Sequence, residues 1–350
     1  MGLGIPVAWT DAHRLHAPET GVWVGVPIAA DELPERAEQI RAELEGAGAP
    51  VVPAEPHSDD AVLAVHDHEL VGFLRTAWET WSEAGYLDDP GQAEVVGYIF
   101  PTPGLLGDVA PHVPASPAAR TGTFCFDTMT GVGRGTWEAA RAAVDAALTA
   151  ADLVHGGARA AYACCRPPGH HVTRGAYGGS CYLNNAAITA RYLRDRGMGR
   201  VAVLDVDAHH GNGAQSIFSD DGSVLTGSVH VDPGAGWFPH FLGFAHESGP
   251  TNLNLPLPPG SGDGPWLAAV ARLVHAAREH GSDALVVALG VDAHADDPNS
   301  PLAVSDEAFR EAGRRLGALG LPTVVVQEGG YVLDTVGALV RAVLEGFEEA

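Results

Sequence analysis

The sequence predicts an α/β protein with three layers, in which helices cover both faces of a mainly parallel sheet. From residue 160 onward, short apolar runs alternate with helical segments, and this alternation is typical of a parallel sheet. The expected strands are almost continuously apolar, as strands buried on both faces are. The sequence contains no internal repeat and no clear linker, so residues 1–350 are expected to form a single domain.

The N-terminal part of the chain is less regular. Residues 1–30 carry scattered polar side chains and are expected to be irregular. Proline and acidic residues begin a helix that runs from Pro34 to about Gly46, as helix starts prefer. Two further helices are expected within residues 59–83. Residues 86–135 are rich in Gly and Pro and are expected to be irregular, and a helix runs from Thr136 to about Val154.

Beyond residue 160 the expected elements follow one another closely. The expected strands are 160–165, 201–205, 224–229, 284–289 and 322–327. The expected helices are 183–196, 213–219, 265–280, 306–319 and 334–349.

Composition and charge limit the classes of function. The chain has 350 residues, of which 46% are hydrophobic, enough for a sizeable core. Its 44 acidic residues against 20 Lys and Arg give a formal net charge of −24, which argues against a nucleic-acid partner. No apolar run is long enough to span a membrane, and no signal peptide is evident. A cytoplasmic protein is therefore expected, and its four cysteines are expected to be buried thiols.

Metal-binding residue types are concentrated at the end of the strand expected at 201–205. Asp205, Asp207 and His209 alternate along the chain, so their side chains would point the same way while the chain stays extended. Carboxylates and an imidazole oriented together are what a divalent metal ion needs. A polar turn with a helix cap would explain one aspartate, but not two aspartates and two histidines within six residues. The pattern therefore favours a metal site.

Three other expected strands are also followed by chemically active residues. Ligands bind beyond the carboxyl ends of the strands in an open parallel sheet, so the shared position of these residues on one sheet edge predicts a single site. The residues are His170 and His171 after strand 160–165, Asp292 after strand 284–289, and Tyr331 after strand 322–327.

Together these residue types predict metal-assisted hydrolysis of a carbonyl compound. Two carboxylates and one imidazole with an open coordination position are the arrangement of a catalytic zinc ion, which makes bound water a nucleophile. His170 and His171 are then free to transfer protons, a role that imidazole suits near neutral pH. Tyr331 follows two glycines and could donate a hydrogen bond to a developing oxyanion.

Four motifs in this order resemble the histone deacetylase superfamily. They are Arg166-Pro-Pro-Gly-His-His, Asp205-Val-Asp-Ala-His-His-Gly-Asn-Gly, Gly290-Val-Asp and Glu328-Gly-Gly-Tyr. Within that superfamily, the runs that begin at Gly178 and at Trp237 are similar to the acetylpolyamine amidohydrolase branch of bacterial, class II-type deacetylases. The resemblance covers nearly the whole chain and is weakest over residues 85–120, where it implies an irregular active-site rim and dimer loop.

The resemblance implies the arginase-deacetylase fold, with an eight-stranded central sheet. It also implies that Asp207, His209 and Asp292 bind one zinc ion per chain, with Fe²⁺ or Co²⁺ able to replace it. A structural potassium ion would bind beside the zinc. The implied potassium-site residues are Asp205, Asp207, His209, Ser228 and Val229.

The resemblance assigns roles in proton transfer as well. His171 would be the main general base and acid, and His170 would give electrostatic help. Asp205 would orient His170, and Asn212 would contact His171. Because Asn212 is an amide rather than a carboxylate, we expect a lower pKa at His171 than an aspartate partner would give.

Substrate contacts are implied for Tyr331, which would polarise the carbonyl, and for Gly179, whose carbonyl oxygen would accept the amide N–H. Relatives usually place two aromatic residues on the walls of the acyl channel. Phe238 would supply one, but Ser180 stands where the other is expected. A wider or more polar channel is therefore predicted.

A second departure lies in the loop before Cys125. The acetylpolyamine branch typically carries a glutamate there that faces the distal ammonium group of the substrate, whereas this chain has an alanine at about position 118. Arg120 nearby would repel a polyamine and could pair with a substrate carboxylate instead. Both features lower the expected activity toward acetylpolyamines.

The function predicted from these observations is zinc-dependent removal of an acetyl or other small acyl group from an N-acylated amine. Water would attack the amide carbonyl, zinc and Tyr331 would stabilise the oxyanion, and His171 would protonate the leaving amine. The substrate is expected to be a small molecule because loops like residues 85–120 narrow access in relatives, commonly through dimerisation. A homodimer is expected for the same reason.

Three alternatives remain. A protein lysine deacylase would release acyl groups from peptides and act weakly on small amides. A non-catalytic metal-dependent binder is disfavoured by the intact set of His170, His171 and Tyr331. An arginase-like two-metal hydrolase needs more carboxylates and histidines than this cluster offers.

Overall fold

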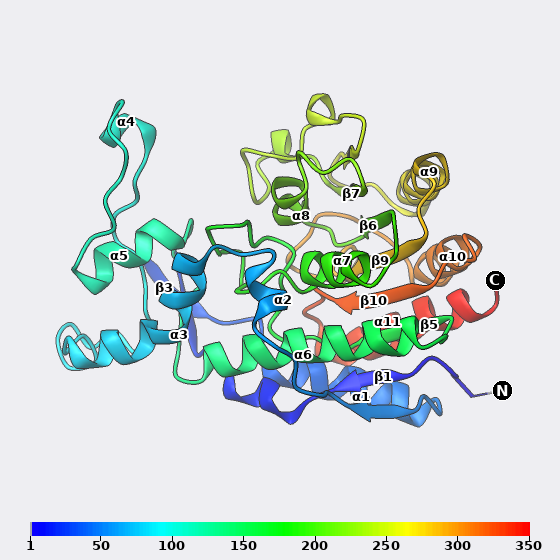
Figure 1. Ribbon diagram of the computed structural model, residues 1–350, viewed down its shortest axis with the longest axis horizontal. Helices are drawn as coiled ribbons and strands as arrows, with labels where there is room; N and C mark the ends of the chain where they lie inside the picture. Colours follow the sequence, from blue (N-terminus) through cyan, green and yellow to red (C-terminus); the bar gives the residue numbers. More distant parts are fainter. Residues whose placement is uncertain (1) are drawn as a thin grey trace.

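The computed structural model describes residues 2–350 (Figure 1). At its centre is an eight-stranded sheet in which every neighbouring pair of strands is parallel. The strands are β1 (Val7–Trp9), β4 (Val51–Pro53), β5 (Ala160–Ala163), β6 (Val201–Asp205), β7 (Val224–Val231), β8 (Asn252–Leu257), β9 (Ala284–Leu289) and β10 (Thr323–Gln327). Their order in the sheet is β4-β1-β5-β10-β9-β6-β7-β8.

Helices cover both faces of this sheet (Figure 1). They are α1 (Pro34–Gly46), α2 (Asp60–Leu63), α3 (His68–Glu83), α4 (Pro103–Leu106), α5 (Pro117–Phe124), α6 (Thr136–His155), α7 (Asn185–Asp195), α8 (Asn212–Ile217), α9 (Asp263–His280), α10 (Asp306–Gly317) and α11 (Leu333–Glu348). Short 3-10 helices lie at Asp11–Leu15, Pro233–Ala235 and Ala245–Glu247. No helix within residues 2–350 combines the length and the apolar character needed to cross a membrane.

Alternation along the strands sends side chains into two separate cores. On β6, Val201 and Val203 belong to the core beneath α3, α6 and α7. Ala202 and Leu204 belong to the core beneath α1, α9, α10 and α11. Both faces of the strand are therefore apolar, which is why these strands read as continuous apolar runs. The predicted fold class, an α/β/α arrangement around an eight-stranded parallel sheet, is confirmed.

The expectation that residues 1–30 are irregular is wrong. This segment contains β1, a 3-10 helix and an antiparallel hairpin of β2 (Thr20–Trp23) and β3 (Val26–Ala29). Strand β1 has only three residues and is defined by pairing with β4 and β5, which are distant in the sequence. The hairpin turns at Val24 and Gly25, which have φ angles of 50° and 78°. Valine rarely adopts positive φ, so the usual hairpin signal is missing.

Strands β4 and β8 and helix α5 were also not expected. Strands β4 and β8 are the two edges of the sheet. Strand β8 contains Asn252, Asn254 and Pro256, and a proline fits an edge strand but not the apolar pattern of a central one. Helix α5 lies within the stretch expected to be irregular, and α4 lies on an arm that projects from the body of the molecule (Figure 1).

Candidate active site

Four of the expected strands lie side by side in the sheet, in the order β5-β10-β9-β6. Because all four are parallel, their carboxyl ends share one edge. The segments that follow these strands therefore meet. They carry His170 and His171 after β5, Tyr331 after β10, Asp292 after β9, and Asp207 and His209 after β6.

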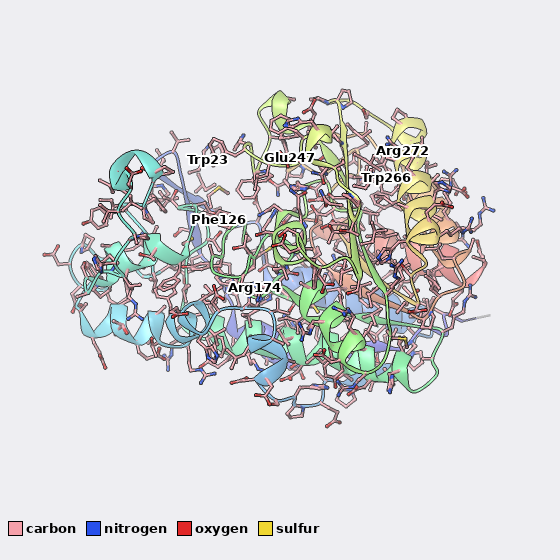
Figure 2. All side chains as sticks on the ribbon, turned by 45° about the horizontal axis from the view of Figure 1, so that its top comes forward. Trp23, Phe126, Arg174, Glu247, Trp266 and Arg272 are labelled. Atoms are coloured by element: carbon pink, nitrogen blue, oxygen red, sulfur yellow. The ribbon has the colours of Figure 1, made fainter. Side chains whose placement is uncertain are left out.

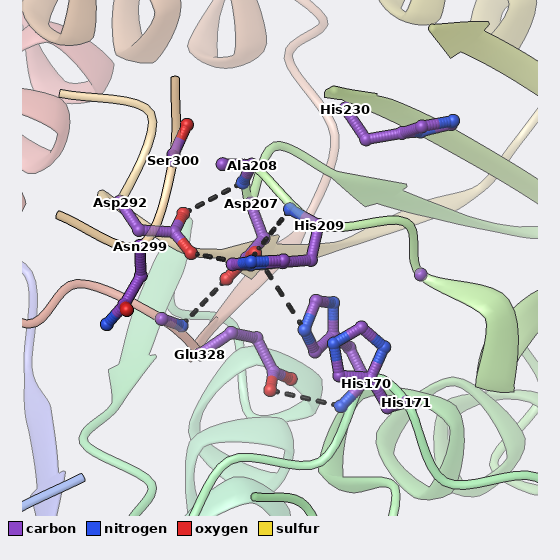
Figure 3. Close-up of polar contacts among 12 residues, drawn as sticks. His170, His171, Asp207, Ala208, His209, His230, Asp292, Asn299, Ser300 and Glu328 are labelled. Atoms are coloured by element: carbon purple, nitrogen blue, oxygen red, sulfur yellow. Dashed lines mark hydrogen bonds and ion pairs between the residues drawn. The ribbon is translucent and has the colours of Figure 1, made fainter. Parts of the chain in front are cut away.

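Asp207, His209 and Asp292 converge to form a candidate metal centre (Figure 3). One potential ligand atom of each residue lies within 4.8 Å of those of the other two. The Nδ1 atom of His209 is 3.1 Å from Oδ1 of Asp207 and 2.9 Å from Oδ2 of Asp292. Both aspartates are fully buried. Two carboxylates and one imidazole that face a single point are the donor set of a catalytic zinc site.

Backbone amides hold the two carboxylates in place. Asp207 accepts hydrogen bonds from the N–H groups of His209 and Gly329, each at 2.8 Å. Asp292 accepts one from the N–H group of Ala208 at 2.8 Å. A Cβ atom on Gly329 would lie 2.4 Å from Oδ2 of Asp207, so only glycine allows this close approach of the backbone. The Gly-Gly pair after β10 is thus part of how the cluster is built.

The charges of the cluster favour a bound cation. Burial and the negative charge of Asp207 raise the pKa of Asp292 to about 7. Burial alone would lower the pKa of His209, but hydrogen bonds to Asp207 and Asp292 raise it well above its usual value. Two buried carboxylates that face each other repel, and a divalent cation between them offsets that repulsion. The residues present therefore fit a zinc ion, and the same donor set accepts Fe²⁺ or Co²⁺.

His170 lies beside the cluster (Figure 3), and it is paired with the carboxylate of Asp205. Its Nδ1 atom is 2.9 Å from Oδ2 of Asp205, and its Nε2 atom is 3.9 Å from Oδ1 of Asp207. Burial lowers the pKa of His170, but the charges of Asp207 and Asp205 outweigh burial and raise it to about 10. A histidine that keeps its positive charge near neutral pH suits electrostatic stabilisation better than proton abstraction.

His171 packs against His170, with ring centroids 4.0 Å apart and the rings tilted by 39°, but the surroundings of the two side chains differ. Its Nδ1 atom is 2.7 Å from Oδ1 of Asn212, so Nδ1–H donates to the amide oxygen and Nε2 keeps its lone pair. Burial and the positive charges of His170 and His209 lower the pKa of His171 well below its usual value. His171 is therefore a neutral imidazole that is able to accept a proton.

Replacing Asn212 by aspartate is expected to raise the pKa of His171. The new carboxylate would lie against Nδ1 and would favour the imidazolium form. If neutral His171 is the base, the acid limb of kcat/KM against pH should move to higher pH, by about one unit or more. The control is Asn212→Ser, which removes the amide without adding charge and should leave the acid limb near that of the wild type. An unmoved acid limb in the aspartate variant would show that His171 does not set it.

Tyr331 is held at the edge of the cavity by Asp297 and Arg36. Its backbone N–H donates to Oδ2 of Asp297 at 2.8 Å, and the guanidinium group of Arg36 lies 4.7 Å from the centre of its ring. Arg36 also donates to the backbone oxygens of Glu328 at 2.7 Å and Gly330 at 2.5 Å. Burial raises the pKa of Tyr331 well above its usual value, although Arg36 lowers it. The phenol therefore stays protonated and can donate a hydrogen bond.

The turn that contains Gly179 and Ser180 approaches His171 closely. The N–H of Gly179 donates to Oδ2 of Asp127 at 2.6 Å, and the N–H of Ser180 donates to Oγ1 of Thr130 at 2.9 Å. Both turn residues have positive φ angles, 62° and 61°. A Cβ atom on Gly179 would lie 2.3 Å from Cδ2 of His171. The turn therefore requires glycine at position 179, both for its conformation and for space.

A cavity of about 360 Å³ leads to these residues. The β2–β3 hairpin, which was not predicted from the sequence, forms part of the cavity wall. Phe238 points an edge toward His171, with ring centroids 4.8 Å apart. The site residues that line the cavity are His171, Gly179, Ser180, His209, Phe238 and Tyr331.

Three of the five expected potassium-site residues lie on neighbouring strands, and the other two, Asp207 and His209, follow β6. Asp205 on β6 pairs in register with Ser228 on β7, and Val229 follows it. His210 is buried on the other side of the strand end, with its Nε2 atom 3.2 Å from Oδ1 of Asn254. The candidate metal cluster of Asp207, His209 and Asp292 does not include His210.

The structure places Arg120, which could pair with a substrate carboxylate, away from the cavity of its own chain. Residues 117–124 form α5 instead of an irregular loop. The helix turns Arg120 onto Phe73, with the guanidinium group 5.9 Å from the centre of that ring. Ala118 is buried in the same helix. The cavity of the chain is lined by neither residue.

Several residues that shape the site had no role in the sequence prediction. Glu328 is buried, and its Oε2 atom accepts hydrogen bonds from the N–H groups of Gly169 at 2.7 Å and His170 at 3.1 Å. Glu328 directly follows β10, just as the candidate metal ligands follow β6 and β9. This position could have marked Glu328 as a site residue. Asp127 and Asp297 lie in irregular segments and bind backbone amides, so no sequence pattern marks them.

The parallel sheet, the convergent cluster and the paired histidines define a hydrolase of the arginase-deacetylase fold. The histone deacetylase domain matches residues 30–347 of the chain. The chain is 38% identical over 346 residues to the acetylpolyamine amidohydrolase of Mycoplana ramosa. The alignment covers 97% of this chain and 98% of that protein. It is 40% identical over 338 residues to the acetylpolyamine amidohydrolase of Burkholderia pseudomallei (strain 1710b), covering 95% and 96%.

Structural comparison agrees with these sequence similarities. The crystal structure of acetylpolyamine aminohydrolase from Burkholderia pseudomallei, obtained from an iodide soak, superposes with a TM-score of 0.92 at 38% identity over 98% of each chain. The chain therefore belongs to the histone deacetylase family, and it is a hydrolase that acts on amides. The family resemblance that the four motifs indicated is confirmed.

Proposed function

We propose that the protein is a zinc-dependent amidohydrolase that removes an acetyl or other small acyl group from an N-acylated amine, a small molecule. The observation that carries the proposal is the convergence of the Asp207, His209 and Asp292 cluster with His171 and Tyr331 at one cavity. A metal centre, a neutral imidazole and an O–H donor are the groups that amide hydrolysis needs. The relatives described above are named for acetylpolyamines, which are small N-acyl amines.

The protein's own groups divide the work of proton transfer and charge stabilisation. His171, with Nδ1–H fixed by Asn212, presents Nε2 to take a proton from the attacking water and to return it to the leaving amine. Tyr331 donates its O–H to the carbonyl oxygen as negative charge develops there. Burial, together with the positive charge of the neighbouring His170, holds the pKa of His171 low. The carbonyl oxygen of Gly179 would accept the amide N–H and orient the substrate.

Asp207, His209 and Asp292 would hold the zinc ion. When bound, a divalent ion supplies an acidified water and a positive charge near the carbonyl. We also propose a structural potassium ion beside this site, because strands β6 and β7 bring oxygen-bearing residues together there. Its residues would be Asp205, Asp207, His209, Ser228 and Val229.

A turnover screen tests this function. Zinc-loaded protein is incubated with acetylated polyamines, acyl-lysine peptides and N-acetyl amino compounds, and the released amine is measured. Hydrolysis of at least one small N-acyl amine is expected, with little acyl release from peptides. Strong release from peptides with weak action on small amides would establish a protein lysine deacylase instead. A zinc-loaded protein that hydrolysed no amide would refute the proposal.

Replacing Ser180 by phenylalanine is expected to worsen turnover of the true substrate. Ser180 lines the cavity, and a phenyl group there would narrow the channel that Phe238 bounds on its other side. A tenfold or larger fall in kcat/KM, of about the size that one misfitting group causes in a pocket, should be measured. The control Ser180→Ala keeps the channel open and should stay close to the wild type. An unchanged or improved rate in the phenylalanine variant would contradict the proposed role of Ser180.

We propose that the protein is a homodimer and that the arm carrying α4 forms the contact. The arm projects from the body (Figure 1) and exposes Tyr98, Leu105 and Val109 at 73%, 61% and 66%. Apolar side chains grouped on a projecting segment are typical of an interface. The double variant Leu105→Glu, Val109→Glu should shift the protein to monomer in analytical ultracentrifugation without lowering its Tm. A monomeric wild-type protein would refute this assignment of the arm.

We also propose that residues 1–350 act as one deacetylase domain in the cytoplasm. The family match covers most of the chain, from residue 30 to residue 347. All four cysteines are free and buried, as in proteins that work in a reducing compartment. Fractionation of cells that express the chain would test the location.

A further inference from the structure

The part of the cavity wall that faces solvent is largely apolar. Trp23, Ile28 and Met129 line the cavity and are exposed by 51%, 37% and 38%. The ring of Phe126 lies 6.3 Å from that of Phe238 and extends this wall. Trp23 and Phe126 lie toward the α4 end of the molecule, opposite the end where Trp266 and α9 lie (Figure 2). Exposed apolar side chains gathered at the entrance of a site are suited to an apolar ligand.

Among the residues that the structure describes, three carboxylates line the cavity, namely Asp31, Glu32 and Asp127. Glu32 is buried, accepts a hydrogen bond from Arg36 at 2.6 Å and lies 2.9 Å from Nε of Arg166. Both guanidinium groups lie at Oε1 and balance the charge of the side chain, while Oε2 accepts no hydrogen bond. Asp31 is exposed to solvent, where water screens its attraction for a cation.

Asp127 is engaged as well. Its Oδ2 atom accepts hydrogen bonds from the N–H of Gly179 at 2.6 Å and from the hydroxyl of Thr130 at 3.1 Å. Its Oδ1 atom accepts bonds from the N–H groups of Met129 and Thr130, each at 2.9 Å. A carboxylate has about four acceptor positions, and these four donors fill them. Asp127 thus fixes the Gly179 turn and is not free to bind a substrate cation.

We propose that the enzyme prefers N-acyl amines whose distal part is uncharged and apolar, and that it discriminates against a distal ammonium group. The inference rests on the proposed function and names the substrate class of the same site. A distal ammonium group would lose hydration in this cavity, where the charge of the one buried lining carboxylate, Glu32, is already balanced by two guanidinium groups. An alkyl or aryl group would instead leave water for the wall formed by Trp23, Ile28 and Met129. The preference differs from the acetylpolyamines for which the relatives are named.

The test compares two substrates that differ only at the distal end. The zinc-loaded protein is assayed with N-acetylbutylamine and with N-acetylputrescine, which has the same carbon chain and a protonated amine at neutral pH. The kcat/KM value for the neutral amide is expected to be at least about tenfold higher, mainly through a lower KM. Equal or faster hydrolysis of N-acetylputrescine would overturn the inference and leave the proposed function intact. Hydrolysis of neither would also overturn the inference, whereas the proposed function falls only if the protein hydrolyses no amide in the turnover screen.

A second variant tests the wall directly. Met129→Glu places a carboxylate in the apolar wall, and Met129→Gln is the matched control of the same length without charge. The glutamate variant is expected to raise kcat/KM for N-acetylputrescine by about tenfold or more and to lower it for N-acetylbutylamine. The glutamine variant should not raise activity toward N-acetylputrescine. If both variants, shown by circular dichroism to be folded, keep the wild-type ratio between the two substrates, the wall does not select the distal group and the inference is wrong.

Discussion

Asp292→Asn is expected to lower kcat/KM by at least about a thousandfold and to leave the protein without zinc. Asp292 and Asp207 are buried and meet at His209. Loss of one of the two negative charges weakens the hold on a divalent cation, and a metal centre contributes several kcal/mol to amide hydrolysis. About 4 kcal/mol corresponds to a thousandfold change in rate. The measurement is kcat/KM together with the zinc content of the purified protein.

The asparagine side chain separates loss of metal from loss of structure. Its oxygen can still accept the hydrogen bond from the N–H of Ala208 that Asp292 accepts at 2.8 Å. Metal-free variant and metal-free wild type should therefore melt at similar temperatures, whereas zinc should raise Tm only in the wild type. Asp283→Asn is the matched control, because Asp283 precedes β9 and Asp292 follows it. Full zinc content and activity in Asp292→Asn would show that the cluster is not the metal centre.

The central strands could be predicted from sequence because a strand that is buried on both faces appears as a continuous apolar run. Strands 201–205 and 284–289 have the expected bounds, since each begins with an apolar run that follows a charged residue, Arg200 or Asp283. Strands β1 and β4 have three residues each and depend on pairing with distant partners. No local pattern marks so short a strand. The β2–β3 hairpin was missed for a different reason, the positive φ angle of Val24 at its turn.

The cluster of candidate site residues could be predicted from sequence for the same reason as the central strands. Its residues follow apolar strands, so the sequence shows both their residue types and their position at the carboxyl edge of the sheet. The cavity that surrounds the cluster was not. Trp23 and Ile28 reach it from the unpredicted hairpin, and Met129 and Asp127 reach it from a loop without periodicity. The positions of these cavity-lining residues are set by tertiary contacts, which no local sequence pattern indicates.

Tyr331→Phe is expected to lower kcat by about 100- to 1,000-fold, with a smaller change in KM. The phenol O–H is lost, and removal of one donor to a developing oxyanion has an effect of this size. Zinc content should not change, because Tyr331 lies outside the cluster of Asp207, His209 and Asp292. The phenylalanine ring can still lie 4.7 Å from the guanidinium group of Arg36, as the tyrosine ring does. The measurements are steady-state kinetics and metal analysis.

Tyr182→Phe is the control that makes this result specific to position 331. Tyr182 also lines the cavity, but it donates its O–H to the backbone oxygen of Gly131 at 2.6 Å. Removing that hydroxyl should leave a buried acceptor unpaired and cost about 1–3 kcal/mol of stability, with kcat within a few fold of the wild type. Opposite outcomes at the two positions, a catalytic loss at Tyr331 and a stability loss at Tyr182, separate a hydroxyl that acts on the substrate from one that supports the wall. If Tyr331→Phe kept a kcat within tenfold of the wild type, the carbonyl oxygen must be stabilised by another group, and the donor role of Tyr331 would be disproved.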